Sequence, residues 1–220
     1  EDKTQSDYSD YAYVYDAIAG YGAYFTDNNG NYVSPNQYIQ GKDSYRKYFQ
    51  EFRISSPHEN RFRVIAGLFW QRQAHNIEQN YIIDNIADAI TVPGTESDIW
   101  FTKQLRKDRD AAIFGEASFD VTDKLTMTGG LRLYKYKNSL EGFFGFNNPG
   151  YSGNPVYLCQ GPATVAGAPC NNVNKTTSDT DFIHKANATY KTDDDKLVYV
   201  TWSKGFRPGG INRRGSLPPY

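Results

Sequence analysis

The sequence predicts an all-β fold: part of a large up-and-down transmembrane β-barrel, with about seven antiparallel strands, short periplasmic turns and long extracellular loops. Three observations predict this class. The 220-residue chain contains 18 Tyr and 13 Phe but a single Met, a composition that favours strands over helices. Several stretches alternate apolar and polar residues with period two. Short and long connections between these stretches alternate strictly along the chain.

The alternating stretches place one set of side chains on each face of a sheet. In the clearest of them, Leu125, Met127, Leu131 and Leu133 share one face, with polar residues between most of them. The first stretch is rich in Tyr and alternates poorly. We expect strands within 8–24, 45–54, 61–73, 111–120, 125–134, 182–190 and 198–202.

The connections decide between a membrane barrel and other β folds. Those at 55–60, 121–124 and 191–196 are short and polar, whereas those at roughly 25–43, 80–108 and 143–179 are long. Compact domains rarely contain several structureless loops longer than about 12–15 residues. Outer-membrane barrels do, because their long loops all face outward. A secreted β-sandwich gives no reason for long loops at alternate connections only.

Bulk charge and motifs argue against several other classes of protein. The formal net charge is -1, so nothing favours nucleic acid as a partner. The mean hydropathy is -0.69, and no apolar run approaches the roughly 18 residues of a membrane helix. Ser203 lacks the G-x-S-x-G context of a hydrolase nucleophile. We therefore expect no enzyme activity and no cofactor, and the three separated His residues predict no metal site.

Three ordered segments resemble those of a known family. The segments "FQEFRISSP" (49–57), "AAIFGEASFDVTDKLTMTGGLRLYKYK" (111–137) and "YVTWSKGFRPGGIN" (199–212) are similar to recurring segments of TonB-dependent outer-membrane receptors, of the iron-complex or siderophore type. The resemblance implies a bacterial cell outer membrane. It also implies that 1–220 is a partial β-barrel domain, with the plug domain and the remaining strands outside this chain.

The function that this resemblance implies is active uptake of a scarce solute. A ferric siderophore is the leading candidate, and haem, vitamin B12 or a sugar remain alternatives. The partners implied are outer-membrane lipid, the small-molecule ligand and the TonB complex, which would supply energy through the missing plug. Two other readings remain open: a secreted β-sandwich carbohydrate-binding module, and a passive porin.

The basic corner of the third segment has two interpretations. The structural one is a rim and aromatic girdle, in which Pro208 ends strand pairing and the following glycines permit a sharp exit. The functional one is an entry collar for anionic ligands. The residues concerned are Trp202, Lys204, Phe206, Arg207, Pro208 and Gly209.

Ligand contacts are expected from two groups of side chains near the outer mouth, although each of these residues could also belong to the girdle or wall. Cationic and aromatic side chains facing the lumen would attract an anionic complex, and loop aromatics would stack on it. The lumen candidates are Arg63, Arg132 and Tyr134, and the loop candidates are Trp100, Phe101, Phe144 and Tyr151.

Cys159 and Cys170 both lie in the loop at 143–179. In an oxidising compartment two cysteines in one exposed loop favour a disulfide. Closing so short a loop contributes on the order of 2–3 kcal/mol. The alternative, a soft-metal site, lacks a nearby His.

Overall fold

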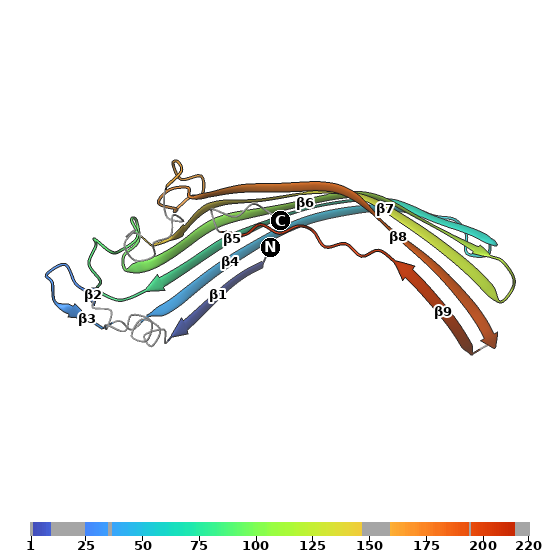
Figure 1. The fold of residues 1–220 in the computed structure, drawn as a ribbon, viewed down its shortest axis with the longest axis horizontal. Coiled ribbons are helices and arrows are strands. Elements are labelled where there is room, and N and C mark those ends of the chain that lie inside the picture. The colour runs from blue at the N-terminus through green and yellow to red at the C-terminus, as the bar shows by residue number, and fades with distance from the viewer. Residues whose placement is uncertain (1, 10–24, 35–36, 147–158, 194, 214–220) are drawn as a thin grey trace.

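A computed structural model describes residues 2–9, 25–34, 37–146, 159–193 and 195–213, which form one curved antiparallel sheet and one small hairpin (Figure 1). No helix in the described residues is long and apolar enough to cross a membrane. The hairpin joins β2 (Phe25–Thr26) to β3 (Tyr32–Val33). The strands of the sheet are β1 (Asp2–Ser9), β4 (Tyr38–Ser55), β5 (Phe62–Ile82), β6 (Asp98–Asp120), β7 (Leu125–Gly145), β8 (Val173–Asp193) and β9 (Lys196–Ser203).

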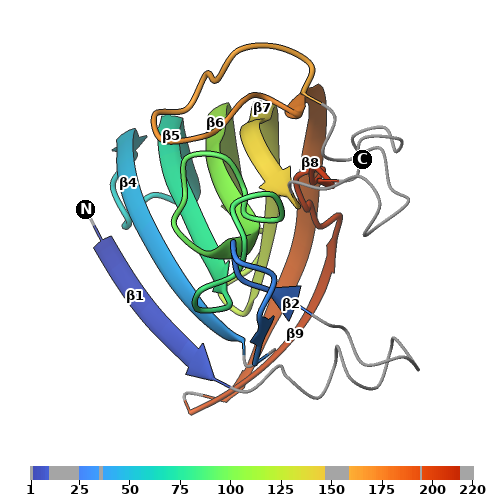
Figure 2. The same cartoon turned by 90° about the vertical axis from the view of Figure 1, so that its left-hand side faces the viewer.

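The order of strands in the sheet is β1-β4-β5-β6-β7-β8-β9, and each strand pairs antiparallel with the next. The predicted up-and-down topology is therefore confirmed. The short connections gather at one end of the strands and the long ones at the other. Viewed along the strands, the sheet is an open trough with β1 and β9 as its two edges (Figure 2).

The strands extend further toward the long loops than the alternation predicted. β6 begins at Asp98 rather than near 111, and β5 continues to Ile82 rather than ending near 73. At ~3.3 Å per residue these strands are about 70 Å long. Crossing a bilayer takes only ~9–11 tilted residues, so much of each strand projects beyond it. Of the predicted first strand, 8–24, only Tyr8 and Ser9 fall in a described strand, β1 at Asp2–Ser9, and 10–24 lie outside the described residues.

One face of the sheet carries an exposed apolar band. The register places Leu68, Ile113 and Leu133 in one row across β5, β6 and β7, and all three are about half exposed. On β5 the band runs from Phe62 to Trp70, which matches the length that crosses a bilayer. This is the convex surface of the trough.

Most buried residues gather near the long loops, and one further cluster, Ala112, Tyr134 and Tyr136, lies midway along the concave face. Phe25, Ile83, Ile86 and Ile99 form one cluster, which joins the β2–β3 hairpin to the loop between β5 and β6. A second cluster joins the loop between β7 and β8 to the upper parts of β6 and β7. The loops are thus anchored to the strand ends by apolar contacts.

Candidate functional site

The concave face of the sheet is polar, as the lumen wall of a barrel should be. On β7 it carries Arg132, Tyr134 and Tyr136, which alternate with convex-face residues such as Leu131, Leu133 and Lys135. The Arg132 guanidinium lies 3.5 Å from the Asp110 carboxylate of β6 and 4.9 Å from the centre of the Phe69 ring of β5. Charges on this wall are therefore held in pairs beside aromatic rings.

A glycine in β5 makes room for one of these rings. A Cβ atom on Gly67 would lie 2.5 Å from the Phe114 ring and 2.6 Å from the carbonyl oxygen of Phe52. The Phe114 ring occupies that space, and Arg53 lies 5.8 Å from its centre. A hollow of about 370 Å³ opens here, lined by Arg53, Phe114, Arg132 and Lys185 among others.

After β9 the chain crosses the concave face (Figure 1). The centre of the Phe206 ring lies 3.7 Å from that of Tyr134 and 5.8 Å from that of Tyr136. The side-chain amide of Asn138 donates a hydrogen bond of 2.9 Å to the carbonyl oxygen of Gly209. Phe206 was expected in a lipid-facing girdle, and the structure places it on the opposite face instead. The alternation of β9 does not continue past Ser203, so parity could not predict its side.

The other residues of the basic corner fall into three places. Trp202 lies on the convex face, 65% exposed, with its ring 4.5 Å from His184. The Lys204 ammonium lies 2.8 Å from the Asp181 carboxylate of β8. Arg207 and Pro208 are exposed, beyond the end of the strand. The corner is therefore split between the two faces, and its expected role as an entry collar remains a proposal.

An aromatic cluster lies at the loop end of the concave face. The Trp100 ring meets Phe144 edge-on at 5.9 Å and Phe146 at 4.7 Å, and Tyr81 lies 6.4 Å away. Phe144 is 7% exposed, whereas Trp100 is only half-buried. Of the predicted ligand-contacting aromatics, the structure brings Trp100 and Phe144 together, and Trp100 is the more accessible.

Phe101 follows Trp100 directly and points to the opposite face. It is 5% exposed and packs with Phe143, Val92 and Cys170. Cys170 is joined to Cys159 by a disulfide with 1.99 Å between the sulfur atoms. Phe101 therefore anchors the disulfide loop, and the structure leaves it little surface for a ligand. Tyr151 lies outside the described residues.

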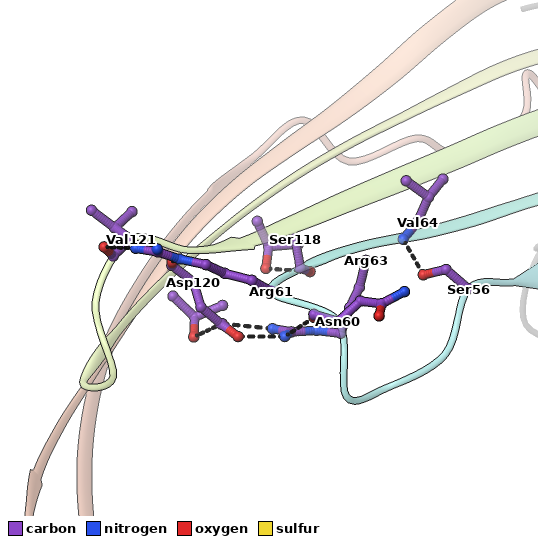
Figure 3. Close-up of polar contacts among 10 residues, drawn as sticks. Ser56, Asn60, Arg61, Arg63, Val64, Ser118, Asp120 and Val121 are labelled. Carbon is purple, nitrogen blue, oxygen red and sulfur yellow. Dashed lines mark hydrogen bonds and ion pairs between the residues drawn. The ribbon is translucent and has the colours of Figure 1, made fainter.

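Arg63 lies at the far end of the sheet from the long loops. Its guanidinium makes two hydrogen bonds to the Asp120 carboxylate, one of 2.7 Å, and a third of 2.9 Å to the Asn60 carbonyl oxygen (Figure 3). Arg61 beside it donates to the carbonyl oxygens of Asp120 and Val121. These bonds tie two neighbouring short turns together, so Arg63 belongs to a latch remote from the mouth.

Sequence reasoning missed a second group on the concave face. The His75 ring stacks on Tyr45 at 3.8 Å, and its Nε2 lies 2.6 Å from the Asp43 carboxylate. The sequence predicted strands at 45–54 and 61–73, so Asp43 and His75 fell just outside them and Tyr45 at the very start of the first. Its position in the sequence could have indicated this: His75 is an even number of residues from Arg63 and Phe69, and residues so spaced on one strand share a face.

A carboxyl group near the loops has an unusual environment. Asp98 is 4% exposed, and its Oδ2 accepts no hydrogen bond. Burial, together with the smaller effect of the negative charge of Glu78, raises the pKa of Asp98 to about 7. Asp98 also anchors the preceding loop, because its backbone carbonyl oxygen accepts a hydrogen bond of 2.8 Å from the Val92 amide. No three potential metal ligands are grouped within the described ranges.

This geometry has counterparts among known proteins. The family model for the TonB-dependent receptor-like β-barrel matches residues 1–218. The chain belongs to the TonB-dependent receptor family. Proteins of this family are transport receptors of the outer membrane rather than enzymes, which places the convex apolar band in lipid.

Individual relatives of this TonB-dependent receptor chain match parts of it. The rhizobactin receptor of Rhizobium meliloti (strain 1021) is 33% identical over 94 residues, which is 42% of this chain and 11% of the relative. The ferric yersiniabactin uptake receptor FyuA of Yersinia pestis has a similar fold, with a TM-score of 0.61 at 15% identity over 86% of this chain and 26% of FyuA. The ferric-catecholate import receptor Fiu of E. coli K12 gives a TM-score of 0.45 at 18% identity, covering 81% of this chain and 26% of Fiu. The chain therefore spans a minor part of each of these proteins.

The family match bears on the two alternative readings. The described strands of the sheet form a single layer, whereas a β-sandwich needs two sheets packed face to face. The same match favours a TonB-dependent receptor over a passive porin.

Proposed function

We propose that this chain forms part of the wall of a receptor that imports a ferric siderophore with energy supplied through TonB. The observation that carries the proposal is the aromatic and charged concave wall at the loop end of the sheet. Trp100 presents a half-buried ring there, beside Tyr81 and Phe146. A ring held edge-on by its neighbours is preorganised to stack on a flat chelate.

Cationic groups near these rings suit an anionic ferric complex. The Lys175 ammonium is partly buried on the concave face, 3.1 Å from the side-chain oxygen of Asn212. Arg132 lies deeper, with its charge shared with Asp110. A ligand captured at the rings would therefore meet paired charges further along the wall. The names of the rhizobactin and ferric yersiniabactin receptors support a siderophore as the solute.

Binding by the whole receptor tests the role of Trp100. Trp100→Ala should weaken binding of the cognate ferric siderophore about tenfold, because one aromatic contact contributes ~0.5–1.5 kcal/mol beyond the area that it buries. Trp70→Ala is the matched control, since Trp70 lies on the convex face. Fluorescence titration with a panel of ferric siderophores would identify the ligand and measure both variants. Equal effects of the two substitutions would contradict the proposal.

Uptake of radioactive iron tests the transport step separately. The receptor should support uptake of its ferric siderophore in iron-starved cells, and deletion of TonB should abolish uptake without changing binding. Uptake that continues without TonB would contradict the energy source and favour passive diffusion.

A further inference from the structure

Four exposed cations lie on the convex face, at and just beyond the outer edge of the apolar band. The register pairs Arg72 of β5 with Arg109 of β6, and Arg109 with Lys137 of β7. Lys135, two residues nearer the band, pairs with Ala111, which in turn pairs with Trp70. We call Arg72, Arg109, Lys135 and Lys137 the outer cation row. All four are exposed.

The sign of charge at this height differs between the two faces. The convex positions next to the outer cation row are Tyr48, Gln50, Ser178 and Thr180, none of them acidic. The concave face at the same height carries four carboxylates: Asp108, Asp110, Asp179 and Asp181. At this height, negative charge among the described residues is thus confined to the lumen side.

Other cations on these strands are held by carboxylates. Arg106, Arg132 and Lys204 on the concave face are each paired with one, and so is Lys107, which lies nearer the loops on the convex face and pairs with Glu141. Across the part of the chain that the structure describes, no residue of the outer cation row forms an ion pair. Neighbouring strands are only ~4.8 Å apart, and like charges directly opposite each other are destabilising. A bound anion would offset that repulsion.

The position of the row indicates where such an anion comes from. Directly beneath it lie Trp70, Leu68, Ile113 and Leu133, which are exposed and face the bilayer. An anion at this level therefore belongs to a molecule whose acyl chains can cover those side chains. Guanidinium groups bind phosphate oxygens in pairs, and ammonium groups add point charges.

We propose that the outer cation row binds the phosphate groups of an anionic glycolipid of the outer leaflet. The acyl chains lie along the apolar band, and the phosphates bridge Arg72, Arg109 and Lys137. The other end of the band offers no comparable surface, because Lys124 and Lys196 there alternate with Asp123 and Asp193. The site is therefore specific for one leaflet and independent of the ligand bound on the concave face.

Lipid binding by the whole purified receptor tests this site. The probe is phosphorylated lipid A in phosphatidylcholine nanodiscs, with retained lipid counted by native mass spectrometry. The triple variant Arg72→Gln, Arg109→Gln, Lys137→Gln should bind it about 100-fold more weakly, since each cation near an anionic surface contributes ~1 kcal/mol and 1.4 kcal/mol is tenfold. The matched control Lys124→Gln, Lys191→Gln, Lys196→Gln removes the same charge at the other end and should bind like the unaltered receptor.

Two further arms separate the lipid from its parts. The unaltered receptor should retain dephosphorylated lipid A poorly. Its retention should be as low as that of phosphorylated lipid A by the triple variant. Inorganic phosphate in excess should displace little lipid, because it lacks acyl chains. Equal retention of phosphorylated lipid A by the triple variant, or displacement by inorganic phosphate alone, would overturn the proposal. Ferric-siderophore affinity should be unchanged in the triple variant.

Discussion

Arg63 and Arg132 have the same side chain and face the same side of the sheet, but their environments differ. Arg63 is held by Asp120 and the Asn60 carbonyl oxygen between two short turns. Arg132 lies midway along β7 beside Phe69. Parity predicted correctly that both face the lumen wall. Parity could not predict where along the barrel wall each arginine lies or which carboxylate it pairs with, because both depend on residues that are distant in the sequence.

The bidentate Arg63–Asp120 pair should contribute to stability and not to ligand binding. Replacing Arg63 with Met leaves the Asp120 carboxylate with Thr126 as its remaining side-chain donor, so the unfolding free energy of the receptor should fall. Urea unfolding in detergent micelles would measure this. Affinity for the ferric siderophore should stay the same, and a large loss of affinity with unchanged stability would restore Arg63 as a ligand contact.

Asp98 should make the loop before β6 sensitive to pH. The folded-state pKa of Asp98 is about 7, against 3.8 as the ordinary value. The folded form therefore holds a proton that the unfolded form releases, and stability falls as the pH rises from about 4 to about 7. The full penalty, at most about 4 kcal/mol, is present above pH 7.

Hydrogen exchange at the Ile83 and Val92 amides would measure this effect. The Ile83 amide donates to the carbonyl oxygen of Ser97, directly before β6, and the Val92 amide donates to that of Asp98. After correction for intrinsic exchange rates, their protection should be greater at pH 5 than at pH 8. In Asp98→Asn the difference should disappear, because that side chain does not titrate. A variant with the same pH dependence as the unaltered protein would point to another group.

The upper part of β7 shows how a side chain can act as a strand partner. β8 begins at Val173, opposite Gly142, so Phe144 lies beyond the last paired residue. The side chain of Asn172 accepts a hydrogen bond of 3.0 Å from the Phe144 amide and donates one of 2.8 Å to the Phe144 carbonyl oxygen. It thereby satisfies backbone groups that β8 does not reach.

Asn172→Ala should open this end of β7 locally. Two buried backbone groups would lose their partners, so protection of the Phe144 amide should fall by about 1–3 kcal/mol. Hydrogen exchange followed by mass spectrometry would detect the loss. The control is Asn174→Ala, an exposed position two residues away. Equal protection in both variants would show that the loop is held by its apolar contacts and disulfide alone.

The strands themselves were only partly predictable. Within 111–120 one face meets lipid, and apolar residues recur at every second position. Between Lys103 and Asp110 the same strand carries charged or polar residues on both faces, so the period disappears although the strand continues. The alternation therefore marks the membrane-spanning part of each strand, and the projecting part was taken for loop.

At the scale of the whole molecule, topology could be predicted because it depends on connection length, which the sequence displays directly. The concave site could not be predicted in full. Trp100 and Phe144 were expected separately, but their contact depends on the register of β6 with β7 and on where the loops pack. The crossing of the concave face by 204–213 likewise depends on contacts that no periodicity shows.

The open edges of the sheet predict how residues 1–220 behave when produced alone. In the described strands, β1 pairs only with β4 and β9 only with β8. Unpaired backbone groups cost several kcal/mol each in hydrocarbon, and exposed edges pair readily with other chains. We expect the isolated segment in detergent micelles to associate through β1 and β9, whereas the whole receptor stays monomeric. Analytical ultracentrifugation would measure both, with circular dichroism to show that the segment is folded. A folded, monomeric segment would mean that its edges are protected in another way, for example by the chain that crosses the concave face.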